Sequence, residues 1–280
     1  MKTSSALAWL AGASLLVPGV VSAQVFSGSG PGAGPWDIPD GGQNTGNPGD
    51  WGAPLLVTFN VSGLAQPIGG VSLSITMNHS FIGDLDVQLF GPSGNPADPM
   101  AQGFVIFSRV GQQVDRGMFN ESGSSWRLGT YHEDNSGNLV FDAPATYNFS
   151  DNASGDLWAT AGFNTTAGTN VDSTGNIPAG GYRTSVAGPW DSVGNTHGGN
   201  HNAGQLTSFA TDSGFIGLTP AQADGTWTLR IRDGGTNDVG NVTASGLTVT
   251  AVPEPIHYAL MTGLGLIVFA GYRRYSRTEA

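Results

Sequence analysis

Short runs of alternating apolar and polar residues constrain the fold of this chain more than any other feature. In Val71–Met77 every second residue is apolar, with Ser or Thr between, and Leu85–Leu89 and Trp227–Ile231 alternate in the same way. A period of two turns one set of side chains toward a core and the other toward water. The pattern predicts antiparallel sheets packed in pairs, with Asp86 and Gln88 on an outward, wet face.

Turn-forming residues separate these runs and complete the all-β pattern. Gly91-Pro-Ser-Gly94 turns the chain, and Phe104–Phe107 and Leu247–Thr250 are further short strands. Two stretches do not resemble strands. Gly28–Gly52 is rich in Gly and Pro and predicts an extended entry segment, and Asn164–Gln205 predicts a long surface excursion.

The N-terminal residues 1–23 have the features of a secretory signal peptide. Lys2 gives a positive start, an apolar run covers Ala6–Val21, and Val21-Ser-Ala23 is a small-x-small exit. Cleavage is therefore expected between Ala23 and Gln24. Residues 24–251 form the exported part, a length that one β-sandwich or barrel domain can use entirely.

Charge and cysteine content exclude several classes of function. The chain has no cysteine, so disulfides, thiol nucleophiles and thiolate zinc sites are all excluded. Its formal net charge of −11 argues against nucleic acid or anionic lipid as a partner. An acidic exported domain of this kind is suited to solubility and to binding cations.

Several segments together resemble one known family, the P domain (P/Homo B domain) of kexin-like and furin-like subtilases. The two most specific are HSFIGDLDVQLFGPSG, His79–Gly94, and GTWTLRIRDGGTNDVG, Gly225–Gly240. Weaker matches in the family's order are IPDGG at Ile38–Gly42, NLVFDAPA at Asn138–Ala145 and IPAGGY at Ile177–Tyr182. The resemblance implies a jelly-roll-type β-sandwich over nearly the whole exported chain. The chain departs from the family at Ser80, where Thr is usual, and in the long segment from Val171 to Gln205.

The residues predict no catalytic centre. In the resembled family a subtilase domain cuts the substrate, and we expect no room for one between Ala23 and Ile38. No GxSxG elbow occurs, and Asp212-Ser-Gly214 is a lone aspartic-protease-like triplet where such enzymes need two. Two of the three residues between His197 and His201 are glycines, so a polar loop is favoured over a helical zinc site.

Calcium is the ion that the acidic turns favour. Asp233, Asn237 and Asp238 lie in one Gly-rich turn, and Asp84 begins the strand motif after His79. Calcium prefers carboxylate and carbonyl oxygens supplied by loops, and the P-domain resemblance implies calcium near such turns. We therefore predict a site from Asp84, Asp233 and Asp238. The alternative is ordinary turn chemistry, in which Asp and Gly are simply the preferred residues.

The C-terminal residues 252–280 resemble the PEP-CTERM sorting signal. The motif is Val252, Pro253, Glu254 and Pro255, and an apolar stretch of the minimum spanning length follows at 256–272. The arginines Arg273, Arg274 and Arg277 come next and favour a cytoplasmic C-terminus. The resemblance implies recognition and cleavage by an exosortase in the inner membrane of a Gram-negative bacterium. A plain C-terminal membrane anchor is the alternative.

These features predict an exported, non-catalytic protein of the cell surface or exopolysaccharide matrix with a structural or adhesive role. Exopolysaccharide and surface proteins are the expected partners, and nucleic acid is not. One alternative is an accessory P domain acting with a secreted subtilase in proteolysis. Another is a carbohydrate-binding module that stacks sugars on Trp36, Trp51, Trp126 or Trp190, although each of these could instead pack in the core.

Overall fold

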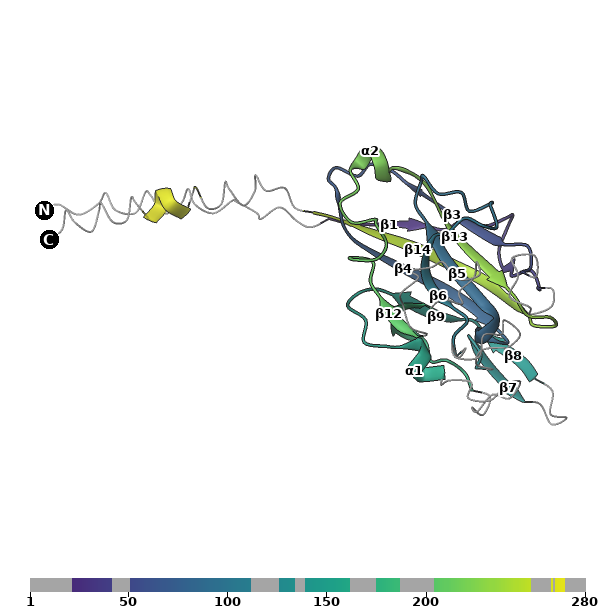
Figure 1. Ribbon diagram of the computed structural model, residues 1–280. Helices are drawn as coiled ribbons and strands as arrows, with labels where there is room; N and C mark the ends of the chain where they lie inside the picture. The colour runs from purple at the N-terminus through teal and green to yellow at the C-terminus, as the bar shows by residue number, and fades with distance from the viewer. Residues whose placement is uncertain are drawn as a thin grey trace, which may run out of the picture.

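A computed structural model describes residues 22–41, 51–111, 126–133, 139–161, 175–186, 204–252, 263 and 265–269. Strands dominate this part of the chain and form two larger sheets and two small hairpins (Figure 1). The predicted all-β class is therefore confirmed. The helical elements are short: η1 (Ile82–Asp84), α1 (Leu157–Ala161) and α2 (Pro220–Ala223).

The larger sheet has the order β1-β14-β4-β9-β10, and β2 also pairs with β14. Its strands are β1 (Ala23–Ser27), β2 (Trp36–Asp37), β4 (Ile68–His79), β9 (Ala145–Phe149), β10 (Gly180–Tyr182) and β14 (Gly240–Ala251). Most pairs are antiparallel, and β10 is parallel to β9. Strand β4 contains the alternating run that the sequence predicted.

The second sheet has the order β3-β13-β5-β6 and is antiparallel throughout. Its strands are β3 (Leu55–Val61), β5 (Leu85–Phe90), β6 (Phe104–Ser108) and β13 (Gly225–Asp233). The hairpins are β7 (Thr130–Glu133) with β8 (Leu139–Ala143), and β11 (Thr184–Val186) with β12 (Gln205–Thr207). The β7–β8 hairpin and α2 lie at opposite ends of the domain (Figure 1).

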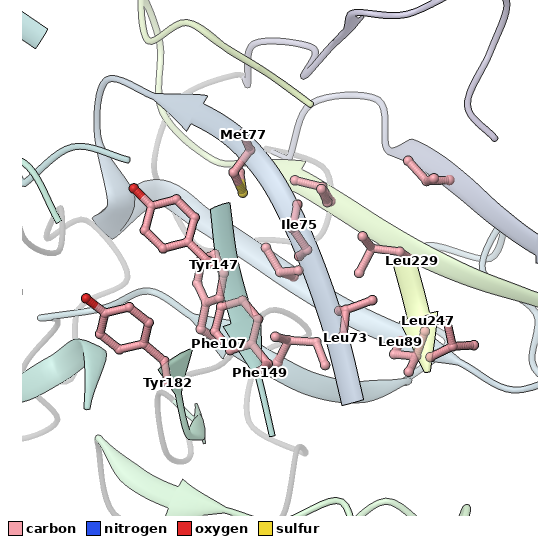
Figure 2. Close-up of a cluster of buried hydrophobic side chains, with 14 of the residues drawn as sticks. Leu73, Ile75, Met77, Leu89, Phe107, Tyr147, Phe149, Tyr182, Leu229 and Leu247 are labelled. Atoms are coloured by element: carbon pink, nitrogen blue, oxygen red, sulfur yellow. The ribbon is translucent and has the colours of Figure 1, made fainter. Parts of the chain in front are cut away.

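The two larger sheets share one apolar core (Figure 2). Leu73, Ile75 and Met77 of β4 are at most 1 % exposed, as their alternation predicts. Across the core, the rings of Phe107 on β6 and Phe149 on β9 stack with centroids 5.6 Å apart. Burying each such side chain stabilises the fold by roughly 1.5–3 kcal/mol.

The outward face of the second sheet differs from the prediction. Asp86 and Gln88 on β5 were expected to face water, but both are 0 % exposed. Arg230 on the neighbouring strand β13 is equally buried. It donates to backbone carbonyls of residues 96–101, so this loop folds back over the outward face. The alternation correctly predicted that Asp86 and Gln88 point away from the core, but it was wrong in predicting that they are exposed to water.

The prediction of a strandless excursion over Asn164–Gln205 is wrong in part. Strands β10 and β11 lie inside it, and Tyr182 is buried beside Tyr147 with ring centroids 6.2 Å apart. Backbone pairing gives these short segments strand geometry although they lack an alternating run. Residues 162–174 and 187–203 lie outside the described part of the chain, and they include the pair His197 and His201.

Both ends of the domain meet at one edge of the larger sheet. Ala23 on β1 pairs with Thr250 on β14, so the predicted cleavage point and the start of the tail are neighbours. No helix within the described residues is long and apolar enough to cross a membrane. Residues 1–21 and most of the tail lie outside that part, including Pro253, Glu254, Pro255, Arg273, Arg274 and Arg277.

Candidate functional site

The predicted calcium ligands lie where two segments meet at the end of the sheets. Helix η1 places Asp84 directly before β5, and the turn after β13 carries Asp238. The backbone joins the two segments, since Gly234 N donates to Asp84 O at 2.9 Å. Gly235 lies against both carboxylates, and a Cβ there would collide with Oδ2 of Asp84 and of Asp238. Only glycine allows this close approach.

Asp84 and Asp238 form a pair of neighbouring carboxylates. Burial, together with the negative charge of Asp84, raises the pKa of Asp238 to about 7. A hydrogen bond between the two side chains adds to the effect, whereas Ser80 Oγ, which donates to Asp238 Oδ1 at 2.9 Å, opposes it. Two like charges in one partly buried place disfavour full ionisation. The pair therefore holds a proton near neutral pH unless a cation replaces it.

Asp233 does not join this pair. Its Oδ2 lies 3.2 Å from His79 Nε2, and its Oδ1 accepts the Gly235 backbone N–H at 2.8 Å. Both Asp233 and His79 are 0 % exposed. Of the three predicted ligands, the structure thus brings two together and commits the third to a different partner. No set of three or more His, Asp or Glu side chains in the described ranges is arranged to hold a metal.

The two carboxylates nevertheless fit a divalent cation in their chemistry. Calcium ligands are carboxylate and carbonyl oxygens from loops, and a cation relieves the repulsion that keeps Asp238 protonated. Asp84 and Asp238 would hold the ion, and backbone oxygens of the Gly-rich turn or water would complete its shell. Asp233 would act indirectly, by holding the Gly235 amide and so the shape of the turn.

Sequence reasoning missed three arginines, one in this region and two on the adjoining outward face of β13. Arg109 is 3 % exposed and lies among Asp84, Asp86 and Asp233, and burial lowers the pKa of its guanidinium against their attraction. Its φ of 48° places a non-glycine residue in the left-handed region, a conformation that costs energy and persists only under tertiary constraint. Arg230 and Arg232 lie further along the outward face of β13.

A sequence signal for this network did exist in the strand register. Arg232 stands opposite Asp86, and Arg230 stands opposite Gln88, on the paired strands β13 and β5. Arg232 donates to Asp86 Oδ2 from its Nη2 at 2.8 Å and from its Nε at 3.2 Å. Asp86 and Gln88 alternate on one strand, and Arg230 and Arg232 alternate on the next. This pattern predicts the Asp86–Arg232 ion pair, but only once the register of the two strands is known.

A groove of about 830 Å³ opens at the other end of the second sheet. The ends of β5 and β6, the hairpin β11–β12, residues 212–215 and α2 surround it. Phe104 and Phe215 form an aromatic part of its lining, with ring centroids 6.1 Å apart. Asp212 and Asp224 give polar edges, and no His, Lys or Arg is among the lining residues. A volume of roughly 300–1,000 Å³ is typical of small-ligand sites.

Within the described residues, Trp36, Trp51 and Trp126 do not form an open stacking platform. Trp36 and Trp126 pack against the core, and Trp51 lies under the guanidinium of Arg232 at 4.9 Å. Trp190 lies outside the described residues. The Asp212-Ser-Gly214 triplet is part of the groove edge, where Asp212 Oδ2 accepts the Ser208 N–H at 2.8 Å.

No protein-family model and no curated protein sequence matches this chain.

Proposed function

We propose that this protein is an exported, non-catalytic β-sandwich of the bacterial surface that holds a neutral polysaccharide in the groove beside α2. Its jelly-roll connectivity and likeness to the P domain remain part of this proposal, as does sorting by an exosortase at Val252–Pro255. The observation that carries the binding role is the lining of the groove, which combines aromatic rings with carboxylate and amide groups and includes no basic residue.

The chemistry of the lining favours a neutral, hydroxyl-rich ligand. Aromatic faces such as Phe104 pack against the apolar face of a sugar, and the edge oxygens of Asp212 and Asp224 accept hydrogen bonds from hydroxyl groups. An anionic polymer would meet two carboxylates and no cation there. The net charge of −11 adds to that repulsion over a longer range.

A buried histidine supports the non-catalytic part of the proposal. His79 and Asp233 form a His–Asp pair of the kind that orients a catalytic base. Here Nδ1 faces Phe81 O at 3.0 Å, and Nε2 faces Asp233, so both ring nitrogens are already engaged. Neither nitrogen is open to a nucleophile, and the ring is 0 % exposed. The pair fits a structural role.

Calcium binding by Asp84 and Asp238 is a second proposal, with a different basis. The raised pKa of Asp238 shows a carboxylate pair that is costly to ionise, and a divalent cation would remove that cost. A thermal melt of the domain with calcium and with a chelator tests it. We expect a higher midpoint with calcium and no such shift in Asp238→Asn; equal midpoints for the parent protein would contradict calcium binding.

Blocking the groove tests the polysaccharide role. Ala221 lines the groove on α2 and is exposed, so Ala221→Trp fills the site without removing a buried contact. Ala143→Trp on β8 is the matched control, because Ala143 is exposed and lies outside the groove lining. Retention on immobilised neutral exopolysaccharide should fall for the first variant alone. Equal retention of both variants, or no retention of the parent protein, would overturn the proposal.

The same preparation separates the alternatives. Peptidase activity in the purified chain would contradict the non-catalytic proposal. Co-purification with a secreted subtilase would favour the accessory P-domain alternative instead. Mass spectrometry of the mature protein tests sorting: an end between Val252 and Pro255 supports cleavage, and an intact Ala280 supports a plain anchor.

A further inference from the structure

The loop between β5 and β6 contains the only Asp–Pro peptide bond of the chain, which joins Asp98 to Pro99. A bond of this kind is sensitive to acid, because the aspartate carboxyl group lies beside its own backbone carbonyl carbon and proline leaves as a secondary amine. Both residues are exposed, so water reaches the bond. The most labile peptide bond of the chain is therefore also an accessible one.

Two N–H groups converge on the carbonyl oxygen of this bond. Arg230 Nη1 donates to Asp98 O at 3.0 Å, and the Ala101 backbone N donates to the same oxygen at 3.1 Å. The Ala101 contact belongs to an ordinary β-turn, whereas Arg230 reaches the oxygen from a strand 132 positions away. Two donors on one carbonyl oxygen, one of them fully charged, form the arrangement that stabilises the oxyanion of an acyl-transfer reaction.

The Arg230 guanidinium is held in place by further contacts. Its Nη2 donates to Gln88 Oε1 at 2.9 Å and to Ala101 O at 2.8 Å, and the Phe90 ring lies 4.7 Å from its Cζ. Burial, together with the charge of Arg232, lowers the pKa of Arg230 to about 10, so the group keeps its positive charge at neutral and mildly acidic pH. The donor is thus fixed before the reaction, and no rearrangement is needed to bring it to the oxygen.

The side chain of Asp98 supplies a nucleophile. Its Oδ1 accepts the Met100 N–H at 2.9 Å, which holds the carboxyl group beside the following peptide units. Within the described residues, Oδ2 accepts no hydrogen bond. Attack of Oδ2 on the carbonyl carbon of the same residue closes a five-membered ring, and such an intramolecular step is favoured by proximity.

From this geometry we propose that the folded domain cleaves its own chain between Asp98 and Pro99. Asp98 Oδ2 attacks the Asp98 carbonyl carbon, and the N–H groups of Arg230 and Ala101 stabilise the negative charge that develops on the oxygen. The carboxyl proton passes to Pro99 N as the C–N bond breaks, which leaves a cyclic anhydride on Asp98. One water molecule opens the anhydride to two carboxylic acid groups, so the net reaction is hydrolysis of one peptide bond.

The two parts should stay together after cleavage, because their strands alternate in the sheets. Strand β5 of the N-terminal part lies between β13 and β6, and β4 lies between β14 and β9. The new α-carboxylate of Asp98 would accept the Arg230 N–H in a charge-assisted hydrogen bond, which is stronger than one to a neutral carbonyl. The reaction occurs once and acts on no other chain, so it goes beyond the proposed binding role without making the protein a peptidase.

Incubation of the purified full chain at about pH 4–5, near the ordinary pKa of an aspartate, tests the proposal. We expect mass spectrometry to find one fragment that ends at Asp98 and one that begins at Pro99, at a rate that depends on neither protein concentration nor peptidase inhibitors. The chain unfolded in urea should be cleaved at least about tenfold more slowly, since one preorganised donor contributes roughly 10²–10³ in enzymes. No cleavage, or equal rates in both states, overturns the proposal.

A second Asp–Pro bond in the same domain provides the matched control. Ala143 is exposed and precedes Pro144, so Ala143→Asp creates such a bond on β8. No arginine of the described part donates to the carbonyl oxygen of residue 143. Cleavage after Asp98 should be at least about tenfold faster than cleavage at the added bond. Equal rates at the two bonds would reveal ordinary acid lability and overturn the assignment.

Variants of the loop and of the donors complete the test. Asp98→Glu should not be cleaved, because its carboxyl group would have to close a larger ring, and unchanged cleavage of this variant would point to a contaminating peptidase and overturn the proposal. Arg230→Lys keeps the charge but not the planar fork and should slow cleavage by about tenfold or more. If a thermal melt shows that Arg230→Lys does not fold, Ala101→Pro decides the question, since it removes the other N–H from the same oxygen. Undiminished cleavage in the folded donor variant would overturn the role of these donors.

Discussion

Replacing Asp86 with Asn should destabilise the domain more than any other single conservative change in the outward network. Asp86 is 0 % exposed, and its Oδ2 accepts both Nε and Nη2 of Arg232. Gln88 Nε2 donates to both of its oxygens, at 3.2 and 3.0 Å. The carboxylate therefore makes four charge-assisted contacts, and it forms a buried ion pair with Arg232.

The size of the destabilisation depends on which buried groups lose their partner in Asp86→Asn. Asn places a neutral amide where the donors of Arg232 and Gln88 already point, and it removes the ion pair between residue 86 and the buried Arg232. Breaking a buried ion pair from one side costs roughly 3–5 kcal/mol. Since a domain of this kind has a total stability of about 5–15 kcal/mol, the loss should lower the urea midpoint greatly.

A double-mutant cycle with Arg232→Gln isolates the pair. The double variant should be less destabilised than the sum of the two single variants, because neither charge is then left alone. Asp142→Asn is the control, since the exposed Asp142 carboxylate lies 2.7 Å from His132 Nδ1, and such surface contacts contribute about 0–1 kcal/mol. A loss below about 1 kcal/mol for Asp86→Asn, equal to that of the control, would refute the reasoning.

Three further predictions concern the carboxylate turn and the core. In the presence of a chelator, raising the pH from about 4 to about 7 should lower the free energy of unfolding by about 1–2 kcal/mol, because Asp238 keeps a proton in the folded state that it has lost in the unfolded chain. The Asp238→Asn variant should flatten this pH profile. The same profile in the variant as in the parent protein would contradict the shared proton. Gly235→Ala should cost about 1–3 kcal/mol in urea unfolding, because its Cβ meets both carboxylates, and a neutral effect would mean that the turn is looser than described. Trp227→Phe should cost about 1–3 kcal/mol by thermal melting, since it leaves a cavity and removes the Nε1 donor to Ala223 O at 2.8 Å; an unchanged midpoint would contradict that contribution.

The alternating runs predicted the inward half of the fold because the core selects side chains by position alone. Val71, Leu73, Ile75 and Met77 occupy successive inward positions of β4, and all are buried. The residue type at an outward position predicts burial less well, because the sequence does not show whether a distant segment covers that position. Arg230 meets the carbonyl of Ala101 across 129 positions, and no local pattern encodes that contact.

The sequence indicated which acidic residues lie near the candidate ion site, but not the direction in which each carboxylate points. Turn residues with carboxylates indicated Asp84 and Asp238, and the structure places their side chains together. Asp233 belongs to the same turn sequence. However, it occupies the last inward-facing position of β13, so its side chain points to His79 at the end of β4. Which way a carboxylate points at a strand end depends on its partner, and that partner is 154 positions away in the chain.

The buried polar groups answer a question that the absence of cysteine raises. A domain without disulfides must restrain distant segments by other means, and apolar packing alone has little direction. Here Arg109 lies over Trp51, and Arg232 lies over the same ring from β13 while it pairs with Asp86 on β5. Each contact requires a defined register between segments far apart in sequence. A misplaced guanidinium or carboxylate would be buried without a partner, so we expect the network to penalise alternative pairings of β5 and β13.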